Sequence, residues 1–176
     1  MYIEETLDSG DVILKEYCTI EEEDTLGTLH DKLKKIGAKG LEKAIDLIES
    51  GKVIAEKQDE SLVTFVKPIS KEQEVIDWSD TKENIYNKIR GLNPFPGALS
   101  YYDDQIIKVY LSEKIDKEYD GEYGEIVEIL NKKGPVVKVK NGGIILKEVK
   151  FQGKKSQSGI DIINGRKIIL NSKFGK

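Results

Sequence analysis

The 176-residue sequence contains one cysteine and one histidine. A single cysteine excludes an internal disulfide, and Cys18 shares a period-two apolar pattern with Leu14 and Ile20, which indicates a strand residue rather than a catalytic thiol. No apolar run is long enough to cross a bilayer, and no basic-then-apolar leader is present. The expected compartment is therefore the cytoplasm, with no membrane partner.

Basic residues are denser from residue 131 onward than before it, and acidic residues are few there. Residues 131–176 carry twelve Lys and Arg against Glu148 and Asp161, a net charge of +10, whereas the remainder carries −14. A basic end on an acidic protein predicts a polyanionic partner for that end. A solvated lysine-rich surface without a partner would explain the same charges equally well.

The first 50 residues predict a turn, a strand and a helix. Residues 7–11 have turn chemistry, so Asp8 read by itself is a turn aspartate, and residues 11–20 alternate like a strand. An amphipathic helix follows from an N-cap at Asp24 or Thr25 to Gly51, with a break expected at Gly37. The broad apolar stripe of this helix must pack against a sheet or another helix, and the sequence before it offers two strands at most, which is too few.

Residues 52–67 predict an extended connector, and we place a domain boundary at about residue 70. A second helix should begin at Asp80 or Thr81 and end at Gly91, with Ile85 and Ile89 on its buried face. Residues 93–97 contain two prolines and must turn. Trp78, the only tryptophan, is expected to fill a junction between two packed units.

The region after residue 97 predicts a small β domain. Asp103-Asp104 and residues 141–143 carry hairpin-turn chemistry, the latter predicting a type I′ turn, and a short helix is expected near residues 158–163 before a final apolar strand. Short strands at this spacing favour a closed or nearly closed barrel, with an OB-like (oligonucleotide-binding) architecture as one candidate. The predicted strands span residues 99–102, 105–111, 124–130, 136–140 and 143–151.

Several blocks in register resemble the methionyl-tRNA formyltransferase family. They are residues 7–11 (LDSGD), 76–78 (IDW), 89–94 (IRGLNP) and 96–98 (PGA), and the similarity covers essentially the whole chain as the downstream part of such an enzyme. The resemblance implies an α/β fragment over residues 1–69, the C-terminal part of a Rossmann-like formyltransferase domain with a linker. It implies a C-terminal OB-like, tRNA-binding barrel over residues 70–176.

The family moves a formyl group from 10-formyltetrahydrofolate to the amino group of initiator methionyl-tRNA, using an asparagine, a histidine and an aspartate. Asp8 matches the aspartate, whose implied role is to orient and charge-stabilise the histidine during proton relay, without any metal. The asparagine, the histidine and most of the folate-binding loop precede this block in the family, and His30 follows it on a separate helix. We therefore expect a fragment that is inactive alone, in which residues 1–50 are loosely ordered, self-associate or pair with a separately encoded N-terminal half.

The resemblance also implies which residues hold the tRNA backbone. Phosphate and shape contacts should dominate over base reading. Two alternatives remain, a sugar-nucleotide (amino-sugar) N-formyltransferase and a non-catalytic tRNA-binding module derived from the family. The candidate tRNA-binding residues are Lys132, Lys133, Lys138, Lys140, Lys154, Lys155 and Arg90.

Overall fold

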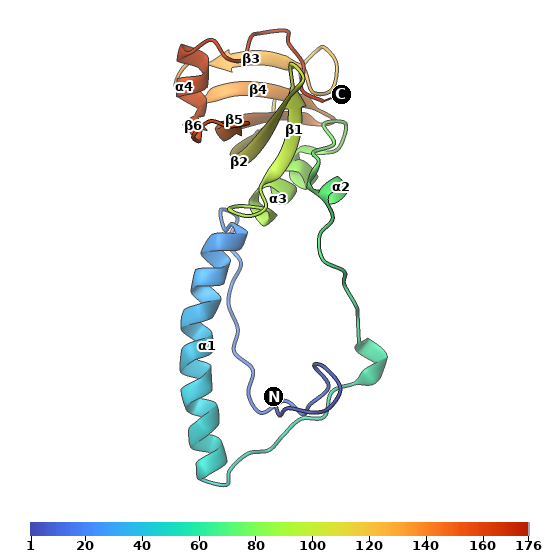
Figure 1. Cartoon of the computed structure of the whole chain (residues 1–176), viewed down its shortest axis with the longest axis vertical. Coiled ribbons are helices and arrows are strands. Elements are labelled where there is room, and N and C mark those ends of the chain that lie inside the picture. The colour runs from blue at the N-terminus through green and yellow to red at the C-terminus, as the bar shows by residue number, and fades with distance from the viewer. Residues whose placement is uncertain (176) are drawn as a thin grey trace. The chain divides into compact units, whose positions relative to one another are not determined.

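A computed structural model describes residues 1–175 and divides the chain into two compact units (Figure 1). Unit 1 contains Met1–Glu22 and Thr28–Pro68. Unit 2 contains Glu23–Gly27 and the chain from Ile69 onward. The short segment Glu23–Gly27 joins unit 2 because the Gly27 amide donates to the Asn93 carbonyl at 2.9 Å.

The long helix of unit 1 is uninterrupted. α1 spans Leu26–Glu49, so the break expected at Gly37 is wrong (Figure 1). Glycine lowers helix stability by about 1 kcal/mol relative to alanine without breaking the backbone hydrogen bonds, so its neighbours carry the helix through. α1 ends before Gly51, which takes a φ of +64°. None of its side chains is buried.

The strand expected over residues 11–20 does not form. Among residues 1–175 this segment makes one isolated antiparallel bridge, between Val12 and Glu56, with hydrogen bonds of 2.8 and 2.9 Å. A strand exists only where a neighbour satisfies its backbone groups, and here the neighbour is the irregular connector. That connector is extended apart from the 3-10 turn η1, Glu60–Leu62.

Unit 2 is built on an antiparallel sheet that contains all five predicted strands. The strand order is β1-β2-β5-β4-β3, with a short sixth strand, β6, paired to β5 (Figure 1). Alternating apolar residues of these strands form the core, as period-two patterning requires. The strands are β1 Ala98–Tyr102, β2 Gln105–Ile115, β3 Ile126–Leu130, β4 Gly134–Val139, β5 Gly142–Phe151 and β6 Gln157–Ser158.

The sheet does not close into a barrel, because its edge strands β1 and β3 do not pair with each other. Instead, the C-terminal segment, residues 171–175, forms backbone hydrogen bonds with residues beside both edges. The Gly175 amide donates to Tyr101 at 3.0 Å, and the Phe174 amide donates to Gly124 at 2.8 Å. The predicted final strand is therefore reduced to two isolated bridges, at Lys173 and Phe174.

Helix α3, Lys82–Gly91, begins and packs as predicted. The Thr81 hydroxyl caps it by accepting from the Asn84 amide at 3.3 Å, and Ile85 and Ile89 are buried. Trp78 lies in the core of unit 2, where its indole N–H donates to the Ser100 hydroxyl at 2.9 Å, so it does not fill a junction between the two units. Buried tryptophans usually place their indole N–H against a hydrogen-bond acceptor, and Ser100 provides it here.

Two turns and two short helices complete unit 2. Asp103 and Asp104 form the β1–β2 turn with φ of +49° and +57°, as their composition predicts. The hairpin turn predicted at residues 141–143 does join β4 to β5, but it consists of Lys140 and Asn141, and neither has the positive φ that a type I′ turn requires, so the predicted type is wrong. Asn141 is drawn into capping α3, because its side-chain oxygen accepts from the Lys82 amide at 2.8 Å. The short helices are α2, Lys71–Glu74, and α4, Gly159–Asn164, the latter close to its predicted position.

Candidate nucleic-acid interface

The lysines beside β4 lie at two opposite ends of that strand. Lys132 and Lys133 occupy the turn before β4, and Lys140 occupies the turn after it. All three are exposed, although Lys133 forms an ion pair with Glu113 of β2. The structure therefore groups Lys132 with Lys133 but separates both from Lys140 by the length of the strand.

Two of the predicted contact residues are held by internal interactions. The Lys138 ammonium donates to the Tyr119 carbonyl and lies 5.8 Å from the centre of the Tyr123 ring. The Arg90 guanidinium donates to the Asp24 carbonyl at 3.0 Å and to the Asn87 side chain at 2.8 Å. Both side chains are half-buried, and their contribution to RNA binding stays a prediction.

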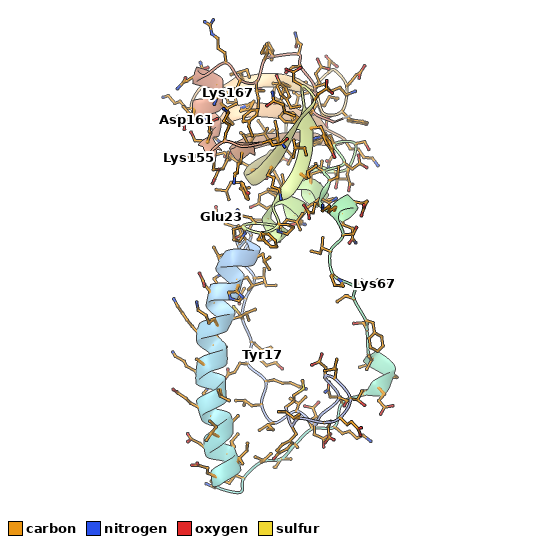
Figure 2. The ribbon with its side chains drawn as sticks, in the orientation of Figure 1. Tyr17, Glu23, Lys67, Lys155, Asp161 and Lys167 are labelled. Atoms are coloured by element: carbon orange, nitrogen blue, oxygen red, sulfur yellow. The ribbon has the colours of Figure 1, made fainter. Side chains whose placement is uncertain are left out.

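Lys154 and Lys155 project from the tight turn that links β5 to β6. Gly153 takes a φ of +71°, and the Lys154 amide donates to the Phe151 carbonyl at 3.0 Å, so the turn is closed by its own backbone. Both lysines are exposed. Figure 2 labels Lys155 and Lys167 at the end of unit 2 that carries α4.

Sequence reasoning missed Lys167, which belongs to this group. It follows α4, and its ammonium donates to the Gln157 side chain of β6 at 2.5 Å. Lys167 and Lys154 line the same cavity, of about 210 Å³. The only sequence signal was membership of the basic C-terminal region, because the two residues are brought together by the return of the chain after α4.

A second cavity, of about 340 Å³, lies beside the β3–β4 turn. Lys132 and Lys133 line it together with Asn131 of the same turn, Glu113 of β2 and Leu130 of β3. The carboxylate of Glu113 partly neutralises Lys133, with which it forms an ion pair, and it also lies 3.7 Å from the Lys147 ammonium. Within residues 1–175, neither Lys154 nor Lys155 forms an ion pair with a carboxylate, whereas Lys133 does.

Asp8 lies on an exposed turn of unit 1 at a φ of +57°. The Gln58 amide fastens this turn by donating to the carbonyls of Asp8 and Gly10, both at 2.8 Å. Gly10 is required there, because a Cβ would lie 1.9 Å from the Tyr2 carbonyl oxygen. The Asp8 carboxylate itself has no hydrogen-bond partner among residues 1–175. The turn therefore leaves it exposed, without an imidazole or other catalytic side chain of the described residues bonded to it.

The described residues contain no group of three or more His, Cys, Asp or Glu side chains arranged to hold a metal ion. Within that same part of the chain, none of the helices combines the length and the apolar character that crossing a membrane demands. His30 is exposed on α1.

Comparison with known proteins gives one matching family and a consistent set of relatives. Residues 68–167 match the family described as formyl transferase, C-terminal domain. The chain is 50% identical to a methionyl-tRNA formyltransferase of Fusobacterium nucleatum over 175 residues, covering 99% of this chain and 56% of that protein. It is 41% identical to the Bacillus subtilis methionyl-tRNA formyltransferase, covering 99% of this chain and 55% of that protein. The chain thus spans about half the length of the curated relatives it matches.

Solved structures share the fold at low sequence identity. A variant of HypX from Aquifex aeolicus superposes with a TM-score of 0.71 at 15% identity, covering 91% of this chain and 29% of that protein. HypX in complex with tetrahydrofolic acid gives a TM-score of 0.59 at 14% identity, covering 77% of this chain and 24% of HypX. At these identities the likeness concerns the fold alone.

Proposed function

Because the chain belongs to the formyl transferase C-terminal domain family, we propose that it provides the tRNA-binding part of a methionyl-tRNA formyltransferase. Such an enzyme moves a formyl group from 10-formyltetrahydrofolate to the amino group of initiator methionyl-tRNA, a cytoplasmic step of translation initiation. The observation that carries this proposal is 50% identity over 99% of the chain to a protein of that name.

We assign tRNA binding to unit 2. Its exposed lysines at the β3–β4 turn and the β5–β6 turn, notably Lys132, Lys154 and Lys155, offer flexible cations that can each neutralise a phosphate. We further propose that the sheet, with the C-terminal segment bonded beside both of its edges, is an OB-like domain whose edge gap is bridged rather than closed. The division at residue 70 then separates a catalytic-domain part from the RNA-binding part.

We propose that Asp8 has the positioning role that the family resemblance implies. A carboxylate can orient an imidazole and stabilise its charged form, but it cannot relay the proton of an attacking amine by itself. The turn around Asp8 is exposed. The tetrahydrofolic acid in the HypX complex supports a folate donor for the whole enzyme.

We also propose that unit 1 is covered by additional protein, either a second copy or another polypeptide. Large apolar side chains of the connector, such as Ile54, Phe65 and Val66, are almost fully exposed, and α1 buries none of its residues. Apolar surfaces of this extent mark interaction sites in folded proteins.

The direct test is binding of fluorescein-labelled initiator tRNA to the 176-residue chain, followed by anisotropy between 50 and 300 mM KCl. Neutralisation of phosphates by lysine releases counterions, so the logarithm of the association constant should fall linearly with the logarithm of the salt concentration. Binding that is independent of salt would contradict the proposal. Saturable binding of a nucleotide sugar in place of tRNA would favour the sugar-nucleotide enzyme.

A further inference from the structure

A small pocket in unit 2 lies where three turns meet. Besides lysines, which could bind phosphates, it is lined by aromatic, carboxylate and amide side chains. We propose that it holds one unstacked guanine base of an RNA, with the lysines at its rim contacting the adjoining phosphates. This inference rests on the proposed tRNA binding and adds a site that reads a base. The pocket is lined by Tyr102, Asp103, Gln105, Phe151, Lys154 and Lys167.

The size and floor of the pocket suit a single base. Its volume is about 210 Å³, below the range of roughly 300–1,000 Å³ typical of pockets for drug-sized ligands. Tyr102 and Phe151 line the cavity but are only 8% and 7% exposed, so they offer it a narrow apolar wall against which a planar base can pack. The Tyr102 hydroxyl is fixed by Ser172 at 2.8 Å and by the Ile169 amide at 3.1 Å, so this wall is preorganised.

The rim of the pocket is cationic. The Lys167 ammonium lies 5.8 Å from the centre of the Phe151 ring and is held by Gln157, which keeps it beside the aromatic floor. The Lys154 ammonium has no hydrogen-bond partner among residues 1–175, so it is available to a ligand. A base in the pocket would therefore have two lysines at its rim to contact the adjoining phosphates.

Asp103 and Gln105 supply the specificity. Neither the Asp103 carboxylate nor the Gln105 amide has a partner within the described part of the chain, although both line the pocket. Guanine is the base that presents two adjacent N–H donors on its Watson–Crick edge, and a carboxylate can accept both. The neighbouring guanine O6 would then accept from the Gln105 amide. Adenine and cytosine would set a ring-nitrogen lone pair against the carboxylate instead.

The test uses the 176-residue chain and labelled hexauridine carrying one central guanine, adenine or hypoxanthine. We expect the guanine probe to bind about tenfold tighter than the adenine probe, the discrimination typical of one bidentate contact. Hypoxanthine lacks the exocyclic amine and should fall between the two. Asp103→Asn should lower the affinity for the guanine probe about tenfold and remove the preference.

The sign of the Asp103→Asn effect separates base reading from simple charge. Removing a carboxylate raises RNA affinity on a surface that only attracts phosphates, whereas it lowers affinity if the carboxylate accepts from the base. Asp104→Asn is the matched control, since Asp104 is the adjacent exposed residue of the same turn, also at positive φ, but does not line the pocket. It should keep the guanine preference. Gln105→Glu, which cannot donate to O6, should weaken that preference as a second, independent variant.

Equal binding of the three probes, or tighter binding by Asp103→Asn, would overturn the pocket assignment. If initiator tRNA still binds with a steep salt dependence in that case, the proposed function stands and only the base site fails. If neither tRNA nor the probes bind, the proposed function itself fails. Urea midpoints equal to that of the parent chain would show that each variant is folded.

Discussion

The side chain of Phe174 should stabilise unit 2 more than any other in the C-terminal segment. It is 1% exposed, and its ring centre lies 5.5 Å from that of Trp78 and 5.0 Å from that of Tyr102. The backbone around it bonds to Tyr101 and Gly124, which lie beside opposite edges of the sheet. Replacing Phe174 with alanine therefore removes the apolar anchor that keeps this segment between the edges.

The magnitude follows from burial and ring contacts. Truncation of a buried phenylalanine to alanine costs about 3–5 kcal/mol, and each aromatic pair contributes about 0.5–1.5 kcal/mol beyond burial. We expect a loss of about 4 kcal/mol in the unfolding free energy of unit 2 for Phe174→Ala. Domains of this size have total stabilities of about 5–15 kcal/mol, so the variant should stay folded but marginal.

Urea unfolding followed by tryptophan fluorescence measures this loss, because Trp78 is the only tryptophan and packs against Phe174. Phe65→Ala is the matched control, since Phe65 is 94% exposed and the same truncation should change stability by less than about 0.5 kcal/mol. Amide exchange at Phe174 and Gly175 should also accelerate in Phe174→Ala. A loss below about 1 kcal/mol would refute the view that this segment holds the two edges.

Three further predictions concern other parts of the chain. Asn141→Ala should destabilise unit 2 by about 1–2 kcal/mol in urea titration, because it removes the oxygen that caps the Lys82 amide, whereas Asn131→Ala in an exposed turn should be neutral. Hydrogen bonds from Lys117 and then Tyr119 lower the pKa of Glu128 below its usual 4.5, so its stabilising effect is present above pH 4.5 and lost as the pH falls through the lowered pKa. In Glu128→Gln the unfolding free energy should depend less on pH in the acid range. A profile of unfolding free energy against pH that equals that of the parent chain would contradict this role of Glu128. Unit 1 should unfold in a separate low-urea transition or self-associate in sedimentation, and one cooperative transition of a monomer would count against its need for a cover.

Local patterns in the sequence were sufficient for most of unit 2. Thr81 and the spacing of Ile85 and Ile89 specify α3, and period-two alternation specifies the five main strands, because caps and side-chain periodicity act between near neighbours. The same reasoning failed over residues 11–20, where an alternating pattern finds no partner strand within the described residues. At Asn141 it predicted a hairpin turn correctly but not its type, because the Asn141 side chain accepts from the Lys82 amide of α3.

Tertiary structure alone decided which distant groups meet. Lys154 and Lys167 reach one pocket with Asp103 because three turns converge there, and no spacing along the chain encodes that convergence. Likewise, residues 171–175 bond beside both sheet edges, because unpaired backbone groups at an edge pair with the segment that the fold brings to them. Secondary structure follows from short-range periodicity, whereas the proposed binding pocket is formed by long-range packing, which sequence spacing does not determine.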